Sequence, residues 1–464
     1  MQPQPELSLI EERGLILPAQ ATLEAEYLFT HALTQEVAYA SLLRADRKLI
    51  HRVVAESIES AYPHRLGEFA GALAYHFELA DEDHKTVTYL LLAAENALKQ
   101  FALTSALPLF EKSAQIARKN QWDEELSRAC GGLAEIHRLQ GNSEAAIALF
   151  DEAVGYSSSA KMRGFYLTQK GFTQHLNMYA FKAAWQSYQA AEAEFEKESD
   201  PAKLGRLYTH MGYFHAVMPA PEDKQIGLEY FERARILLEK TKSYNDLAFA
   251  YAYLALTYSI SVPEKGLDWG KRAIALCQKY GLSEPGEPAA IALGHSCKLA
   301  FNFDHAIRYY HMALEYNRAT NYAFGRAIIQ SSLAAVLLGA GKFAEALQSL
   351  EDSEIHWRKL NHHNALVSIK PMRYIALTEL GETASAQREL NEALQADTKH
   401  HPYIWLEMIE TYTLMGRFES ALEILKIRSA ELTPRQIQYL KTDPIFVRLR
   451  EHKDFPADLP ERDL

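Results

Sequence analysis

Acidic side chains are frequent in this sequence, and we first consider whether any of them are spaced for catalysis. Glu192, Glu194, Glu196 and Glu198 alternate along a segment whose pattern is helical. Residues two apart on a helix point in different directions, so we interpret these carboxylates as a solvated face. The sequence contains no Gly-x-x-x-x-Gly-Lys-Ser/Thr phosphate loop, His-Glu-x-x-His helix or Gly-x-Ser-x-Gly elbow. We therefore predict a protein that is not an enzyme and has no catalytic residues.

Histidines and cysteines are the other candidates for chemistry. Histidine pairs occur at 362–363, at 400–401 and at His210 with His215. A metal site needs three or four converging ligands, and adjacent residues rarely converge. The cysteines form no Cys-x-x-Cys pair, which indicates buried, reduced packing residues. These cysteines are Cys130, Cys277 and Cys297. We expect neither a metal nor a cofactor.

The charge balance argues against nucleic acid and membranes as partners. A basic stretch runs from Arg44 to Arg52, but the formal net charge is −11 and the pI is about 5.9. The longest uncharged run, Leu247 to Pro263, is shorter than the roughly 20 apolar residues of a membrane span and fits a buried helix. Residues 1–8 lack a basic, then apolar, signal-peptide pattern. We expect a cytoplasmic protein.

A pattern of small and bulky residues recurs along most of the chain and must position any functional side chain. Ala346, Leu350 and Ser353 follow the turn residue Gly341, and a comparable series follows Phe303. Spacings of four and then three put such residues on one helical stripe, and the small residues allow a second helix to approach closely. Each unit is therefore predicted to be a helical hairpin.

The hairpins have a period near forty residues. Their first small residues, separated by 35 to 43 positions, are Ala106, Ala146, Ala184, Gly227, Gly266, Ala306, Ala346, Ala386 and Ala421. This period overlaps those of HEAT and armadillo repeats, but the aromatic and small-residue signature resembles the tetratricopeptide (TPR) superfamily over about Leu73 to Leu425. The resemblance implies an all-α, right-handed solenoid of TPR-like hairpins. Proline-rich breaks are expected at 218–223 and 281–288.

In tetratricopeptide arrays the first helix of each hairpin lines the concave groove, and its exposed positions commonly hold a peptide or another ligand. By register, the groove-binding candidates in this chain are Arg128, Glu135, Arg138, Gln169, Thr173, Tyr251, Tyr258, His295 and Lys298. Polar groups and tyrosines at these positions suit recognition. The same tyrosines could instead fill spaces between hairpins, and the charged residues could be merely solvated.

The amino-terminal segment carries a second resemblance. Gly14–Pro18 and Glu26–Thr30 are short apolar or alternating stretches that predict a β-hairpin. The following run, residues 29–51, and then Leu73–Phe77 with Ala93–Glu95 and Ala97, resemble a junction in bacterial signalling proteins. In these, a cyclase or transcription-factor domain precedes a STAND-type ATPase, a winged helix and tetratricopeptide repeats. Residues 6–13 would be the last winged-helix helix and 15–29 its wing. The sequence has no cyclase or ATPase region. We therefore expect either a regulatory fragment of such a signalling protein or a relative that has lost its effector half.

These interpretations give three segments: a partial winged-helix-like segment with a linking helix (1–60), the repeat array (61–430), and a capping helix and tail (431–464). The leading hypothesis is a non-catalytic interaction scaffold or sensory module. It would bind a peptide or protein in its groove and act with a cyclase or ATPase effector domain in cis or in trans. The alternative is a small-molecule-sensing arm of such a regulator, which a compact aromatic pocket would favour. An enzyme with an unrecognised site is the third hypothesis, and self-association is open for all three.

Overall fold

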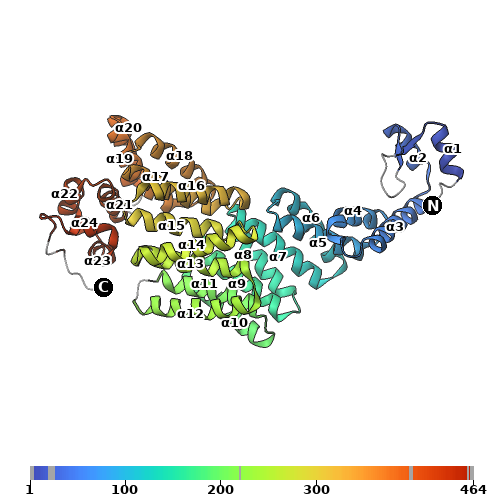
Figure 1. The fold of residues 1–464 in the computed structure, drawn as a ribbon, viewed down its shortest axis with the longest axis horizontal. Helices are drawn as coiled ribbons and strands as arrows, with labels where there is room; N and C mark the ends of the chain where they lie inside the picture. The colour runs from blue at the N-terminus through green and yellow to red at the C-terminus, as the bar shows by residue number, and fades with distance from the viewer. Residues whose placement is uncertain (1–4, 19–26, 219–220, 397–400, 457–458, 460–464) are drawn as a thin grey trace. The chain divides into compact units, whose positions relative to one another are not determined.

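The computed structural model describes residues 5–18, 27–218, 221–396, 401–456 and 459 (Figure 1). The chain divides into two compact units, Met1–Ala129 and Cys130–Leu464, with the boundary inside helix α7 (Asp123–Gln140). We call them unit 1 and unit 2.

Unit 1 consists of a small β-hairpin and a series of helices. Strands β1 (Ile16–Pro18) and β2 (Tyr27–Phe29) pair antiparallel with Ile16 opposite Phe29, which confirms the predicted hairpin; residues 19–26 lie outside the described part. The helices are α1 (Pro5–Glu12), α2 (Ala32–Ser41), α3 (Arg44–Ala61), α4 (Leu66–Leu79), α5 (Asp83–Lys99) and α6 (Leu103–Asn120). Leu73, Phe77 and Leu90 form the centre of the core between α3, α4 and α5. The assignment of residues 6–29 to a winged helix stays a prediction.

Unit 2 is an all-α array in which each helix packs on its neighbours. Its first helices after α7 are α8 (Ser143–Tyr156), α9 (Ala160–Leu176), α10 (Phe181–Lys197), α11 (Pro201–Ala216), α12 (Pro221–Thr241), α13 (Tyr244–Ser261) and α14 (Pro263–Tyr280). The array continues through α15 (Gly286–Leu299), α16 (Phe303–Thr320), α17 (Ala323–Gly339), α18 (Phe343–Lys359), α19 (His363–Glu379) and α20 (Thr383–Ala396). The last helical hairpin is α21 (His401–Leu414) and α22 (Phe418–Arg428).

The carboxyl end is built from short helices that cover the last hairpin. They are η2 (Ser429–Glu431), α23 (Pro434–Thr442), η3 (Pro444–Phe446) and α24 (Val447–Arg450). Phe446 and Leu449 are fully buried against Leu425 and Ile409, as expected of a cap that shields an apolar solenoid end. No helix in the described part of the chain is long and apolar enough to cross a membrane.

The nine small marker residues explain how the hairpins pack. Each of them lies on the second helix of a hairpin and is buried, which confirms the predicted register. At two positions glycine takes the place of alanine. A Cβ at Gly227 would lie 2.6 Å from the carbonyl oxygen of Gly212, and one at Gly266 would lie 2.8 Å from Cα of Ser259. Because the backbones approach so closely there, an alanine methyl group would not fit.

Within unit 2 the array curves until its early and late helices meet. The Tyr322 hydroxyl donates a hydrogen bond to Oδ1 of Asn177 across 2.6 Å, although the two residues are 145 positions apart. The rings of Tyr179 and His362 meet edge to face with their centroids 5.5 Å apart. The inner helices α7 and α9 therefore face the region around α15 and α17, and the inner surface encloses a space between them.

Candidate ligand-binding site

The side chains around this enclosed space come from the first helix of successive hairpins. Helix α9 presents Gln169, Phe172 and Leu176, and the other inner helices present stripes with the same spacing of about one helical turn. The equivalent stripes are Arg206, Thr209, His210 and Tyr213 on α11, Asp246, Phe249, Tyr253 and Leu256 on α13, and Glu287, Ile291 and His295 on α15. Because the stripes repeat from helix to helix, polar residues of neighbouring inner helices lie side by side, and so do their aromatic residues one turn further along.

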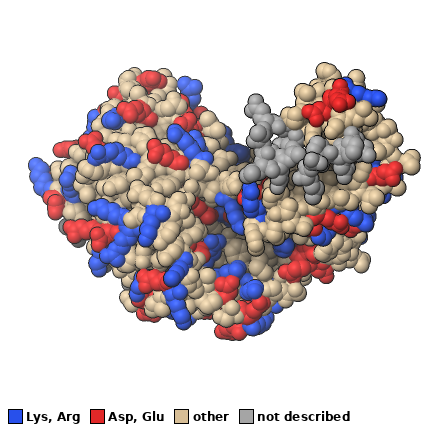
Figure 2. Space-filling model, turned by 45° about the vertical axis from the view of Figure 1, so that its right-hand side comes forward, with Lys and Arg blue, Asp and Glu red and all other residues tan. Residues whose placement is uncertain are grey.

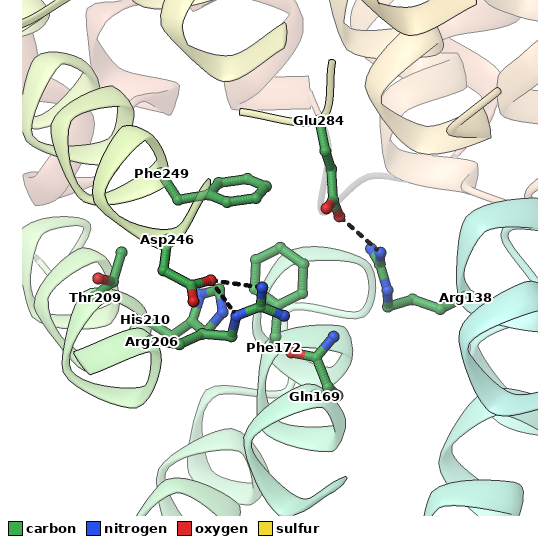
Figure 3. Close-up of a pocket in the computed structure, with 9 residues that line it drawn as sticks. All are labelled: Arg138, Gln169, Phe172, Arg206, Thr209, His210, Asp246, Phe249 and Glu284. Atoms are coloured by element: carbon green, nitrogen blue, oxygen red, sulfur yellow. Dashed lines mark hydrogen bonds and ion pairs between the residues drawn. The ribbon is translucent and has the colours of Figure 1, made fainter. Parts of the chain in front are cut away.

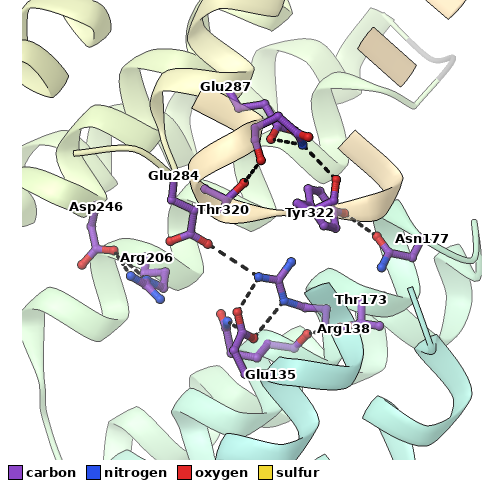
Figure 4. A network of polar contacts seen from close by, with 12 residues as sticks. Glu135, Arg138, Thr173, Asn177, Arg206, Asp246, Glu284, Glu287, Thr320 and Tyr322 are labelled. Atoms are coloured by element: carbon purple, nitrogen blue, oxygen red, sulfur yellow. Dashed lines mark hydrogen bonds and ion pairs between the residues drawn. The ribbon is translucent and has the colours of Figure 1, made fainter. Parts of the chain in front are cut away.

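Arg138 is the centre of a buried polar network (Figure 4). Its side chain is only 3% exposed and forms an ion pair with Glu135 at 2.5 Å and a longer one with Glu284 at 3.5 Å. Its guanidinium also lies over the rings of Phe172 and Tyr322, 5.3 Å from each centroid. Burial alone would lower the pKa of Arg138, but the nearby Glu135 carboxylate outweighs it and raises the pKa, so the side chain stays charged.

A second ion pair joins two adjacent inner helices. Nε and Nη2 of Arg206 bind the same Oδ1 of Asp246 at 2.6 and 2.5 Å, and Asp246 also accepts a hydrogen bond from the Ser243 hydroxyl at 2.8 Å. Arg206 and Asp246 are 40 residues apart, close to the repeat period, so they occupy equivalent positions in successive hairpins. The pair ties α11 to α13 beside the enclosed space.

Two further carboxyl groups come from the segment around the start of α15. Burial raises the pKa of Glu287 to about 8, so this side chain is mostly protonated at neutral pH, and it accepts a hydrogen bond from Nδ2 of Asn317 at 2.8 Å. Burial also raises the pKa of Glu284, against the opposing effect of Arg138. Arg138, at 3.5 Å, is the only ion-pair partner of Glu284 among the described residues. Glu284 therefore has the weakest pairing in the network.

These groups surround a small polar hollow of about 20 Å³, shown in Figure 3. Its lining includes Arg206, Asp246 and Glu284 together with Gln169 and His210, which are each 6% exposed. Oε1 of Gln169 and Nδ1 of His210 are buried and have no hydrogen-bond partner in the structure. Burial, and then the charge of Arg206, lowers the pKa of His210 well below its usual value, so the ring is neutral. Unsatisfied buried polar atoms are costly, which marks the hollow as a place for a polar group.

A larger and mainly apolar cavity of about 160 Å³ adjoins the polar hollow. The two share Arg138, Phe172, Phe249 and Glu284 in their walls, so they form one continuous amphipathic space. The remaining apolar and aromatic lining is Leu139, Leu176, Tyr213, Tyr253, Leu256, Pro288, Ile291, Tyr322, Phe324 and Ile328. We call the combined space the central cavity. An apolar, aromatic-lined cavity with a few convergent polar groups is the usual form of a small-ligand site.

The structure places the predicted groove residues in different environments. Glu135 belongs to the Arg138 network, Arg138, Gln169 and His295 line the central cavity, and Thr173 is buried behind it with its hydroxyl bonded to the carbonyl oxygen of Gln169. Burial lowers the pKa of His295 to about 3, so its ring is neutral. These five residues gather in one region of unit 2.

The other four candidates lie elsewhere. Arg128 belongs to unit 1 and pairs with Glu95 at 2.7 Å. Tyr251 and Tyr258 line a separate hollow beside Trp269, and Lys298 pairs with Glu410 at 3.3 Å. On α13 the residues that face the central cavity are Asp246, Phe249 and Tyr253. Tyr251 lies on the opposite side of the helix, because two residues correspond to about 200° of rotation.

Sequence reasoning did not select several residues of the site. The principal ones are Phe172, Arg206, His210, Asp246, Phe249, Tyr253, Glu284, Glu287 and Tyr322. One signal was available: Arg206 and Asp246 carry opposite charges one repeat apart on helices that must be adjacent. Glu284 offered no such signal, because it lies in the loop before α15 and outside the repeat pattern.

Other kinds of site find no support in the part of the chain that the structure describes. No group of three or more His, Cys, Asp or Glu side chains is arranged to hold a metal ion among these residues. The three cysteines are buried and free, as predicted. Figure 2 shows acidic and basic side chains interspersed over the visible face.

Successive antiparallel helix pairs, buried small residues on every second helix and an inner surface formed by the first helices define a tetratricopeptide-type α-solenoid. Solved structures of this type are similar to the chain. A STAND protein with a tetratricopeptide repeat sensor from Pyrococcus horikoshii shares 14% identity at a TM-score of 0.50, and the match covers 85% of this chain and 58% of that one. A Rap protein complexed with competence and sporulation factor shares 14% identity at a TM-score of 0.51, covering 79% and 99%.

No family model and no curated protein sequence matches the chain. The chain spans 58% of the length of the STAND protein, so that protein contains regions without a counterpart in this alignment. At 14% identity these similarities establish the fold alone, an α-solenoid of helical repeats.

Proposed function

We propose that the chain is a cytoplasmic, non-catalytic sensory module that binds a small ligand in the central cavity of unit 2. The observation that carries this proposal is the cavity itself, about 160 Å³ lined by aromatic and aliphatic side chains with charged groups at one end. A cavity of about 150 Å³ in another protein accommodates benzene, so the space suits a ligand with about one ring or a short aliphatic chain. This supports the small-molecule alternative over an open peptide groove.

The inner surface argues against an extended peptide lying along the groove. Arg138, Gln169 and His210 are each at least nine-tenths buried, and the Tyr322–Asn177 hydrogen bond joins the two sides of the enclosed space. A peptide that followed the inner helices would have to separate these contacts. Binding of a single side chain or chain terminus remains compatible with the cavity.

The signal would reach an effector domain of the ATPase or cyclase type, in cis or in trans. A solenoid transmits strain because each hairpin contacts mainly its neighbours, and a ligand that contacts α9, α11, α13 and α15 together favours one curvature of the array. In the scaffold hypothesis, the array would instead bind a protein partner on its outer surface.

A cavity-blocking variant tests the proposal. Ile328 lines the cavity, and Ile328→Trp would fill much of it; the matched control is Ile355→Trp, because Ile355 on α18 is 64% exposed. Each purified chain is incubated with a metabolite extract, and the retained compounds are identified by native mass spectrometry. We expect retention by the parent chain and by Ile355→Trp but not by Ile328→Trp. Equal retention by all three chains would refute the central cavity as the binding site.

A further inference from the structure

The charges around the central cavity do not balance. Two guanidinium groups, Arg138 and Arg206, are matched against three carboxyl groups, Glu135, Asp246 and Glu284. The close pairs, Arg138 with Glu135 and Arg206 with Asp246, each have nitrogen–oxygen distances near 2.5 Å. Glu284 is left with a single contact at 3.5 Å to an arginine that is already paired. The cavity therefore contains one acceptor carboxyl in excess.

The polar hollow next to Glu284 also has an excess of acceptors. Oε1 of Gln169 has no donor among the described residues, while the amide nitrogen of the same side chain is directed to Glu135 at 3.4 Å, which fixes the orientation of the amide. Gln169 and Glu284 both line the hollow, together with Phe172 (Figure 3). A ligand group with several N–H donors and a positive charge would satisfy both acceptors.

The aromatic walls favour the same kind of group. Phe172 and Phe249 line both the polar hollow and the apolar cavity. The Arg138 guanidinium already lies over Phe172, 5.3 Å from the ring centroid, so Phe249 is the ring that would face a ligand cation held between the two spaces. The face of an aromatic ring attracts a nearby cation, and more strongly where water is excluded. A carboxylate in the same position would be repelled by Glu284 and would find Arg138 and Arg206 already neutralised.

We infer that the ligand of the central cavity is a small organic cation, with a protonated amine directed to Glu284 and Oε1 of Gln169 and an apolar body among Phe172, Phe249 and Tyr253. This inference rests on the proposed function and gives the chemical class of its ligand. It also assigns a role to Glu284, whose side chain is 32% exposed and thus accessible to a ligand, unlike that of Arg138 at 3%.

The experiment compares three probes that share one phenyl group and differ in their polar end: phenethylamine, 2-phenylethanol and phenylacetate. Their dissociation constants for the full chain are measured by ligand-observed NMR at pH 7. We expect the amine to bind at least about tenfold more tightly than the alcohol, corresponding to a charge-assisted hydrogen bond of about 1.5 kcal/mol or more, and the acid to bind most weakly. This comparison requires no variant and so does not depend on a substituted chain folding.

Glu284→Gln then tests the role of the carboxylate. The substitution keeps the shape of the side chain and removes its charge, and the same change at Glu345, whose side chain is 61% exposed on α18, is the control. We expect Glu284→Gln to abolish the preference for the amine over the alcohol, and Glu345→Gln to retain it.

The outcomes separate this inference from the proposed function. If the alcohol or the acid binds as tightly as the amine, the cavity is a ligand site but the cationic class is wrong. If the amine preference persists in Glu284→Gln, the assignment of Glu284 is wrong. If none of the three probes binds, the inference fails, while the retention experiment with Ile328→Trp still decides the proposed function.

Discussion

Removal of Arg138 provides the sharpest test of the buried network. In Arg138→Met, Glu135 loses its 2.5 Å partner and keeps only a 3.4 Å hydrogen bond from Gln169. Removing one partner of a buried ion pair costs about 3–5 kcal/mol. The Glu135 side chain is 20% exposed and retains some hydration, so we expect a loss of about 3 kcal/mol in the free energy of unfolding. Glu135→Gln should cost more, because Arg138 is almost fully buried.

The double variant, Glu135→Gln with Arg138→Met, removes both members of the close pair, and Glu284, 32% exposed, loses only its longer 3.5 Å contact. It should lie within about 1 kcal/mol of the parent chain, because a neutral replacement for a buried ion pair is often close to neutral. The control is Arg235→Met, which removes a pair with the same spacing, Arg235 to Glu232 at 2.5 Å, and a second pair with Glu239 at 2.7 Å. These side chains are 31%, 56% and 41% exposed, respectively. We expect less than about 1 kcal/mol there.

The assay is urea unfolding followed by circular dichroism and by tryptophan fluorescence. Repeat arrays can unfold in several steps, so the two signals must coincide before a free energy is assigned. Coupling between Glu135 and Arg138 should then exceed about 2 kcal/mol in the double-mutant cycle. Additive effects of the two substitutions, each as small as that of Arg235→Met, would refute the view that this pair is buried and structurally important.

Three further predictions concern individual residues. The pKa of Glu287 is raised from 4.5 to about 8, so between these pH values the folded chain holds a proton that the unfolded chain releases. The free energy of unfolding should therefore fall as pH rises through this range. Urea midpoints measured across the range should fall less steeply with pH in Glu287→Gln than in the parent chain. Gly227→Ala should lower the free energy of unfolding by about 1–3 kcal/mol, because the added methyl group overpacks the helix contact. Gly71→Ala has open space around its added Cβ and should leave that free energy unchanged or raise it; thermal unfolding of both variants measures the difference. Tyr322→Phe removes the bond to Asn177 and should lower stability by about 1 kcal/mol and speed hydrogen exchange in residues 177–180.

The hairpins could be predicted because their signal is local and repeated. Helix pairs are present at the positions that Ala146, Ala306 and Ala346 predicted, and these small residues are buried where the two helices of a pair meet. At 227 and 266 a glycine stands where the other seven markers are alanine. The structure gives the physical reason, since at these positions the neighbouring backbone leaves no room for a methyl group.

The central cavity could be predicted only in part. The choice of first helices as the inner surface was enough to find Arg138, Gln169 and His295. It could not identify the contact of Tyr322 with Asn177, because the curvature that joins them is the sum of small rotations over several hairpins, each set by side-chain packing. Tyr251 was selected by its register in the repeat, but Tyr253, two positions further along the same helix, is the tyrosine that faces the cavity.

The position of Glu284 connects ligand binding to the shape of the array. Its 3.5 Å contact with Arg138 joins the loop before α15 to α7, across the enclosed space (Figure 4). A cation that takes Glu284 as its partner competes directly with Arg138, whose charge stays satisfied by Glu135. On the proposed function, binding would weaken one link between the early and late helices at little cost to the buried arginine. A ligand changes a conformational equilibrium only by its difference in affinity for the two states, and we propose that this difference would arise where the ligand replaces the Arg138–Glu284 link.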